Sequence, residues 1–173
     1  MGIAFVQIFN TWPLFLKSTY KLLEDKIGLL LALNALMVAL IEMPLIHGLE
    51  KFNIIKLMGF GGFLLLFGFG MLPLGNTFLF AAATVVVWST GEMLVFPFMA
   101  GFISNRANDS NRGKYMGMFT FTFALALVIG PALGTWIYDT LSPIALWYGI
   151  GVAGVLIWLG FVLLYQLLKI EKK

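Results

Sequence analysis

Six long apolar runs, separated by short polar turns, constrain most strongly what this chain can fold into. A helix needs about 20 mostly apolar residues to cross the hydrocarbon core of a bilayer. The runs come close to or exceed that length, and they cover residues 2–18, 27–46, 57–74, 77–104, 116–138 and 145–168. Spanning strands would instead need alternating segments of about ten residues. The pattern therefore predicts an all-α, polytopic membrane protein, folded as a single bundle of six transmembrane helices.

The composition supports the bilayer as the solvent for this chain. Charged residues make up 11% of it and the mean hydropathy is +0.97, whereas soluble domains carry about 25% charged residues. The chain has no cysteine and one histidine, His47, so no disulfide and no multi-histidine metal site is expected. We expect neither a metal nor another cofactor.

Several classes of function find no support in the sequence. There is no HExxH, no GxSxG and no phosphate-binding loop. We therefore expect no enzyme and no catalytic residues. The basic residues lack the aromatic interleaving of a nucleic-acid surface, so no nucleic-acid partner is expected.

The lysines and arginines predict how the bundle is oriented. If both termini lie on one side, that side carries Lys51, Lys56, Arg106, Arg112, Lys114, Lys169, Lys172 and Lys173. The opposite side carries Lys17, Lys21 and Lys26. Because short cytoplasmic loops are enriched in these residues, we expect both termini in the cytoplasm.

Glu92 is the residue that fits a membrane segment least well. It lies in the apolar run 77–104, which contains no other charge. An isolated carboxylate at the centre of a spanning helix costs roughly 2.5–3.5 kcal/mol even on a lenient insertion scale. Glu92 must therefore be protonated in a dry site or face a wet cavity, and both alternatives suit the handling of protons or cations. Structural hydrogen bonding of a buried carboxyl remains the alternative interpretation.

Two helical faces combine polar and aromatic side chains that could line a cavity. The first face lies on the first run and carries Gln7, Asn10 and Thr11. The second lies on the fourth run and carries Trp88, Ser89, Glu92, Phe96 and Met99. A carboxylate beside aromatic rings and a methionine suits an amphipathic or cationic ligand.

Two further polar residues of the second run are secondary candidates for the site. Asn34 is open to either interhelical hydrogen bonding or ligand contact. Glu42 lies nearer the cytoplasmic end, where it could reach water or pair with Lys51 or Lys56.

Small residues and cations near the fifth run predict close packing and anchoring. "GPALG" places Gly130 and Gly134 one helical turn apart around Pro131. Such a pair allows two backbones to approach, and the proline bends the helix. "NRGKYMG" supplies Arg112, Gly113, Lys114 and Gly117 ahead of the same run. Its cations could join two helix ends or simply anchor the chain at the cytoplasmic surface.

The order of these segments resembles a known family. "FNTWPLFLK", "LALNALMVALIEMPL", "WSTGEMLVFPFMAGFI", "NRGKYMG" and "IGPALGTWIYD" together resemble the C-terminal half of a major facilitator superfamily transporter. The resemblance covers essentially the whole chain and is greatest to the bacterial drug:proton antiporters. It implies two inverted repeats of three helices, in which the first helix of each repeat lines a central cavity. Those are the two runs that carry Gln7 and Glu92.

The resemblance also implies a function. The chain is expected to be the C-terminal half of a proton-coupled secondary transporter in the bacterial inner membrane, exporting drugs or other small amphipathic solutes. Glu92 would exchange protons, with the two polar faces around the substrate. Gly130, Pro131, Gly134, Arg112, Gly113, Lys114 and Gly117 would serve helix packing or gating.

A whole transporter of this kind has about twelve spans, and alternating access needs two bundles. We therefore expect a missing N-terminal half or a second copy of the chain as partner. The abrupt start of the first apolar run favours a fragment, while a subunit of a split transporter and a designed chain remain open. The other functions left open are a non-transporting six-helix module and a homodimeric small-solute transporter.

Overall fold

The computed structural model describes residues 1–108 and 110–170 as a bundle of helices. Its long helices are α3 (Glu24–Leu49), α4 (Ile54–Gly70), α5 (Phe78–Arg106), α6 (Arg112–Thr140) and α7 (Pro143–Ile170). All five are long and apolar enough to cross a membrane, with the short 3₁₀ helix η2 (Leu72–Leu74) extending α4. The predicted all-α, polytopic class is confirmed. Each long helix begins and ends within four residues of an apolar run.

The first apolar run, 2–18, differs from the expected spanning helix because its backbone is broken. It consists of α1 (Gly2–Phe5), the 3₁₀ helix η1 (Val6–Phe9) and α2 (Thr11–Ser18). Asn10 lies at the break with φ −128° and ψ −88°, outside the helical region. Pro13 has no N–H to donate to the carbonyl of Phe9, so an α-helix is not favoured through this point. The new helix starts at Thr11 and places Pro13 in its first turn, where no such bond is needed.

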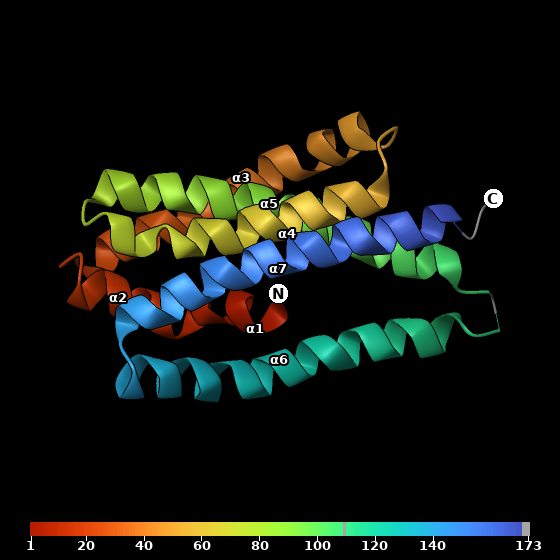
Figure 1. Cartoon of the computed structure of the whole chain (residues 1–173). Coiled ribbons are helices and arrows are strands. Elements are labelled where there is room, and N and C mark those ends of the chain that lie inside the picture. Colours follow the sequence, from red (N-terminus) through yellow and green to blue (C-terminus); the bar gives the residue numbers. More distant parts are fainter. Residues whose placement is uncertain (109, 171–173) are drawn as a thin grey trace.

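The arrangement of the helices is visible in Figure 1. The first segment lies along α6, and α4 packs between α5 and α7. α3 packs against α5, on a face of α5 that α4 does not cover. The first residue, Met1, lies part-way along the bundle and lines cavities between the helices.

α4 and α5 form the tightest helix pair, and glycines make their close approach possible. A side chain at Gly61 would meet the Cβ of Leu94 at 2.6 Å, and one at Gly68 would meet the Cβ of Trp88 at 2.7 Å. A Cβ at Gly91 would lie 2.6 Å from the carbonyl oxygen of Gly61. All three distances are too short for a methyl group. The two backbones therefore touch along several turns, as in other membrane helix pairs built on small residues.

An aromatic cluster fills the core at one end of this pair. Trp88 stacks on Phe69 with ring centroids 5.3 Å apart, and Phe69 stacks on Trp147 at 6.0 Å. Trp12 meets Trp88 edge-on at 6.4 Å. All four side chains are 0% exposed. The cluster joins α2, α4, α5 and α7 by contacts that depend on shape and ring orientation.

Tyr20 fixes the connection between α2 and α3. Its hydroxyl donates a hydrogen bond to the carbonyl of Leu72 at 2.6 Å, which ties the connection to η2. Burial raises the pKa of Tyr20 to about 12, so the phenol keeps its proton at ordinary pH. The neighbouring Lys21 has φ 55°, a left-handed conformation that tightens the turn.

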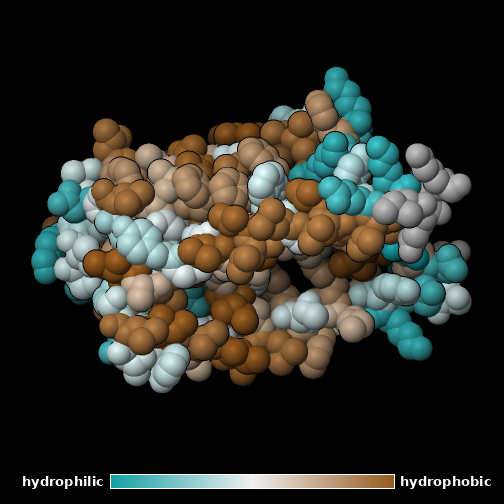
Figure 2. All heavy atoms as spheres, in the orientation of Figure 1, coloured by the Kyte–Doolittle hydropathy of each residue, from teal (hydrophilic) through white to brown (hydrophobic). Residues whose placement is uncertain are grey.

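The outer surface is that of a protein in lipid. Figure 2 shows brown, apolar atoms over the long helices and teal, polar atoms gathered toward the two ends. Large exposed apolar side chains are frequent on α3, α6 and α7, for example Leu40, Val128 and Leu156. Such a surface would be a liability in water and is expected where helices face acyl chains.

The glycine contact between α4 and α5 predicts a position-specific effect of a single methyl group. Gly91→Ala forces the two backbones apart, so we expect it to destabilise the bundle by about 1–3 kcal/mol. The effect is measured as a lower unfolding temperature in detergent.

Gly101→Ala is the matched control on the same helix, because nothing lies within 4 Å of a Cβ at that position. It should leave the unfolding temperature unchanged or raise it slightly, since alanine favours helices. Equal effects of the two substitutions would contradict the packing described for α4 and α5.

Candidate functional site

Glu92 is the central residue of the 29-residue helix α5, and a side chain of α3 binds it. The amide nitrogen of Asn34 donates to Oε2 of Glu92 at 2.8 Å and also lies 3.0 Å from Oγ of Ser89. Asn34 and Glu92 are 58 residues apart in sequence. The interaction therefore joins α3 to α5 in the middle of the bundle.

The carboxyl group of Glu92 has no cationic partner within residues 1–108 and 110–170. The salt bridges in this part of the chain are Lys17 with Glu24 at 2.5 Å and His47 with Glu50 at 3.4 Å. A neutral amide donor can stabilise a carboxylate, but it does not neutralise the charge. Among the described residues, the carboxyl group of Glu92 thus has a neutral hydrogen-bond donor and no counter-charge.

Glu42 lies on the same face of α3 as Asn34, eight residues further along the helix. In the part of the chain that the structure describes, Glu42 forms no salt bridge with Lys51 or Lys56. This side of α3 therefore carries the donor of Glu92 and a second carboxyl group.

Two side chains of this cluster carry oxygens of the kind that bind a hard cation, the carboxylate of Glu92 and the hydroxyl of Ser89. Asn34 directs its amide N–H toward both of them. No group of three His, Asp or Glu residues that could hold a metal ion is found among the described residues. The cluster thus has one carboxylate and one neutral oxygen, which is a better match for a monovalent than for a divalent ion.

Phe96 and Met99, one and two turns beyond Glu92, line an apolar cavity between α5, α6 and the start of the chain. Its volume is about 290 Å³. Phe96 lies edge-on to Phe5 at 5.0 Å and to Phe123 at 5.8 Å between ring centroids. Phe5 and Phe123 were not singled out from the sequence, because nothing distinguishes them among the 17 phenylalanines of the chain.

Trp88 is placed in the core and not on a cavity wall. Its ring is enclosed by Phe69 and Trp12, and its side chain is 0% exposed. Trp88 and Glu92 share a helical face, but that face meets different neighbours along α5. Trp88 packs against α4, Glu92 binds Asn34 of α3, and Phe96 meets Phe123 of α6. Ser89 is also buried, and its hydroxyl contacts Asn34.

The polar residues of the first segment bind one another and α6. The amide nitrogen of Gln7 donates to the carbonyl of Gly130 at 2.7 Å and to the carbonyl of Ile3 at 2.9 Å. Its amide oxygen accepts a hydrogen bond from Thr11 at 2.8 Å. Gln7 and Thr11 are both 1% exposed. Asn10 donates to the carbonyl of Val6 at 3.1 Å, within its own segment.

The glycines of "GPALG" allow the first segment to pack closely against α6. A Cβ at Gly130 would lie 3.3 Å from the carbonyl oxygen of Ile3, and a Cβ at Gly134 would overlap the amide of Gln7. Pro131 lies inside α6 between them. The motif therefore packs α6 against the polar face of the first segment.

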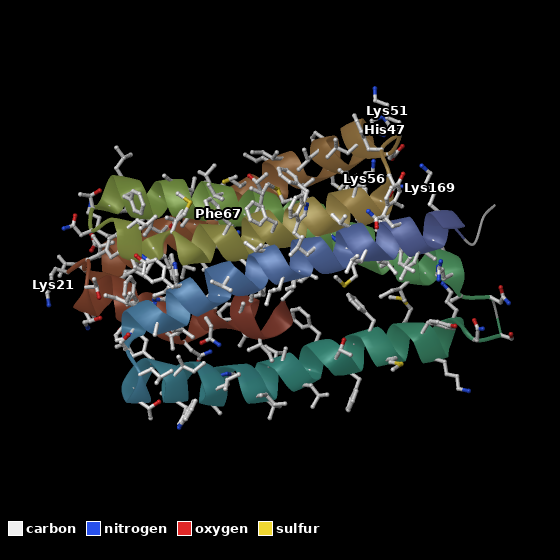
Figure 3. The ribbon with its side chains drawn as sticks, viewed as in Figure 1. Lys21, His47, Lys51, Lys56, Phe67 and Lys169 are labelled. Atoms are coloured by element: carbon white, nitrogen blue, oxygen red, sulfur yellow. The ribbon has the colours of Figure 1, made fainter. Side chains whose placement is uncertain are left out.

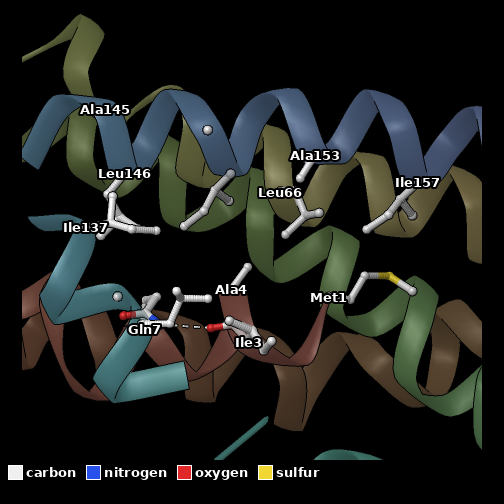
Figure 4. Close-up of a pocket in the computed structure, with 14 residues that line it drawn as sticks. Met1, Ile3, Ala4, Gln7, Leu66, Ile137, Ala145, Leu146, Ala153 and Ile157 are labelled. Atoms are coloured by element: carbon white, nitrogen blue, oxygen red, sulfur yellow. Dashed lines mark hydrogen bonds between the residues drawn. The ribbon is translucent and has the colours of Figure 1, made fainter. Parts of the chain in front are cut away.

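A second cavity, of about 360 Å³, opens beside Gln7 between the first segment, α6 and α7 (Figure 4). Leu146, Ala153 and Ile157 of α7 face Ile3 and Gln7 across it. The amide nitrogen and the amide oxygen of Gln7 both have hydrogen-bond partners within the protein. The cavity is accordingly apolar.

The residues of "NRGKYMG" lie where α5 ends and α6 begins. Arg112 donates to the hydroxyl of Ser104 at 2.8 Å and so joins the two helix ends. Lys114 is exposed, and a Cβ at Gly113 or Gly117 would meet nothing within 4 Å. Lys172 and Lys173, which were counted in the prediction of the orientation, lie outside the described residues.

Comparison with known proteins identifies the family of this bundle. The family model of the Major Facilitator Superfamily matches residues 1–173. The chain belongs to the major facilitator superfamily. This is a family of membrane transporters and not of enzymes.

Two curated relatives are similar to the chain. A "Na(+), Li(+), K(+)/H(+) antiporter" from Planococcus maritimus is 28% identical over 130 residues, which are 74% of this chain and 28% of the relative. An "Uncharacterized MFS-type transporter YqjV" from Bacillus subtilis (strain 168) is 26% identical over 107 residues, or 62% of this chain and 26% of the relative. The matched parts span only about a quarter of each relative's length. No solved structure matches the chain.

The packing of the first segment on α6 can be tested with a disulfide. A Cβ at Gly130 lies 3.4 Å from the Cβ of Val6, near the separation of about 3.5–4.5 Å found in disulfides. Because the chain has no cysteine, Val6→Cys with Gly130→Cys should form one bond under mild oxidation. The bond is detected as a mobility shift on a non-reducing gel.

Val6→Cys with Gly117→Cys is the control pair, since a Cβ at Gly117 has no neighbour within 4 Å. It should remain unlinked. Comparable linkage of the two pairs would show that the first segment is not held against the "GPALG" face of α6.

Proposed function

We propose that this chain forms the C-terminal half of a proton-coupled antiporter in which Glu92 carries the exchanged proton. The observation that carries the proposal is the carboxyl group at the centre of α5, bound by the Asn34 amide and without a salt bridge in the described chain. A group held in this way can exist in a protonated and an ionised form without dismantling the helix packing. Intramembrane carboxyls with this freedom serve as proton carriers in transporters.

In the proposed exchange, charge is conserved at each step. Protonated Glu92 releases its proton to one side as a cationic substrate binds, which leaves a carboxylate paired with that cation. When the substrate leaves on the other side, the carboxylate takes up a new proton. Asn34 donates to Oε2 in both forms and keeps the side chain in place.

The substrate we propose first is a small amphipathic cation that is exported. Phe96 and Met99 lie within two turns of Glu92 and line the apolar cavity of about 290 Å³. Glu92 is not among the residues that line this cavity. The proposed cation would place its charged end at Glu92 and its apolar body against the aromatic wall one to two turns away. Trp88 is not among the residues that line this cavity, because its ring is enclosed by Phe69 and Trp12.

A monovalent metal cation is the second candidate substrate. Two observations favour it: the oxygens of Ser89 and Glu92, and the similarity to a relative named as a Na⁺, Li⁺, K⁺/H⁺ antiporter. Such an ion would bind at the same carboxylate and would not need the apolar cavity.

The proposed location is the bacterial plasma membrane, with the end that carries Lys51, Lys56 and Lys169 in the cytoplasm. Figure 3 shows these cations together at one end of the bundle and Lys21 at the other. Cytoplasmic loops carry such an excess of cations. Transport by rocking of two bundles requires a second bundle, for which we propose an N-terminal half or a second copy of the chain.

The proton role is tested with Glu92→Gln, which keeps the shape of the side chain and removes its titration. The variant is placed in a transporter completed by co-expression with an N-terminal half and reconstituted in vesicles. Under an imposed pH gradient we expect substrate movement to fall at least about tenfold, because glutamine cannot take up a proton. A lipophilic fluorescent cation, Na⁺ and K⁺ are assayed in parallel to separate the two substrate classes.

Glu50→Gln is the matched control, because Glu50 is an exposed carboxylate that pairs with His47 at the end of α3. It should retain the gradient-driven movement of the wild type. If Glu92→Gln transports as well as this control with every substrate, Glu92 is not the coupling residue.

A further inference from the structure

A cavity with a basic rim lies at the end of the bundle where α4 begins and where α5 and α7 end. Its volume is about 460 Å³. The lining residues come from three helices and are Asn53, Ile54, Ile55, Phe102, Asn105, Arg106, Tyr165, Leu168 and Lys169. This cavity lies at the end of α5, far from Glu92 at the centre of the helix, so the role proposed for Glu92 does not explain it.

Three cations surround this cavity without carboxylate partners in the described chain. Arg106 and Lys169 line it, and Lys56 lies over the ring of Tyr165 at 4.6 Å. Arg106 in turn lies over the ring of Phe102 at 5.0 Å. None of the three enters a salt bridge within residues 1–108 and 110–170. The aromatic faces hold Lys56 and Arg106 without neutralising their charge.

The described carboxylates do not contribute to this cavity. Glu50, on the same end of the bundle, is engaged by His47 at 3.4 Å. Asp109 and Glu171 lie outside the described residues. The side-chain amides of Asn53 and Asn105 are the other polar groups on the cavity wall. The cavity is therefore matched in charge to an anion with several acceptor oxygens.

An apolar groove continues directly from the basic cavity. It runs between α4 and α7, has a volume of about 420 Å³, and shares Ile55 and Tyr165 with the cavity. Its other lining residues are Lys56, Gly59, Phe60, Trp158, Phe161 and Val162. α4 and α7 approach closely at its floor, where a Cβ at Gly59 would lie 2.7 Å from that of Phe161.

We propose that the cavity and groove together form a binding site for one anionic phospholipid. The phosphate group occupies the cavity between Arg106 and Lys169, and an acyl chain lies in the groove along α7. Figure 3 shows Lys56 and Lys169 near one another at this end, beside the ribbons of α4 and α7. Basic pockets between transmembrane helices on the cytoplasmic side are suited to lipid headgroups.

The ligand must be amphipathic because the two parts of the site differ in chemistry and share a wall. An inorganic anion would use the cavity and leave the groove unused. An uncharged lipid would use the groove and leave three cations unmatched. The bound lipid would hold the ends of α4, α5 and α7 together at the membrane surface.

The test uses the full chain purified in detergent, with lipid binding followed by native mass spectrometry and by the unfolding temperature. The probes are phosphatidylglycerol, phosphatidylcholine with the same acyl chains, and inorganic phosphate. We expect phosphatidylglycerol to bind about tenfold more tightly than phosphatidylcholine, because cations near a surface favour anionic lipid. Inorganic phosphate should neither compete nor stabilise at comparable concentration.

Two pairs of variants locate the site. Arg106→Gln with Lys169→Gln should weaken phosphatidylglycerol binding about tenfold, since each cation contributes to holding the headgroup. Lys51→Gln with Lys114→Gln removes the same charge from the same end but outside the cavity, and should change binding less than about twofold. Equal weakening by the two pairs would show general surface attraction and overturn the proposal.

The groove is tested separately on α7. Val162→Trp fills the groove and should weaken phosphatidylglycerol binding, while Val152→Trp, an exposed position on the same helix outside both cavities, should not. A wild-type chain that inorganic phosphate stabilises as well as phosphatidylglycerol does would contain a simple anion site. That result would also overturn the lipid proposal.

Discussion

The bundle depends on the direct contact between the backbones of α4 and α5. In lipid, apolar side chains gain little by leaving acyl chains for one another, so helices associate through close packing and interhelical hydrogen bonds. Gly61, Gly68 and Gly91 provide that closeness, because a methyl group at any of them would collide with the facing helix. α7 then packs on α4, and α3 on α5, around this pair.

Polar side chains add hydrogen bonds between elements to the close packing at the glycines, and each joins a different pair of elements. Asn34 joins α3 to α5, and Gln7 joins the first segment to α6. Gln7 has its amide fully engaged, so it acts in packing. Glu92 has one neutral donor and no salt bridge in the described chain, so it retains chemical freedom. This difference in hydrogen bonding separates a structural polar group from a candidate functional one.

The sequence predicted the helices well because apolar length is a direct requirement of the bilayer. The break at Asn10 could not be read from length, since it depends on local dihedral angles beside Pro13. Glu92 could be singled out as the one charge in its apolar run, but its donor Asn34 is 58 residues away and only the fold brings them together. Trp88 lies on the same predicted face as Glu92, yet periodicity does not say which neighbouring helix each turn meets. For that reason periodicity alone could not decide whether Trp88 packs in the core or lines a cavity.

The aromatic cluster gives the protein an optical property that follows from its packing. Trp12, Trp88 and Trp147 are fully buried, and their indole nitrogens have no hydrogen-bond partner among the described residues. Trp136 and Trp158 are 59% and 44% exposed. The fluorescence of this chain therefore combines emitters in a dry environment with emitters at the surface. Since Trp88 is one helical turn from Glu92, a rotation of α5 would change the fluorescence of the buried tryptophans, and no added label is needed to follow it.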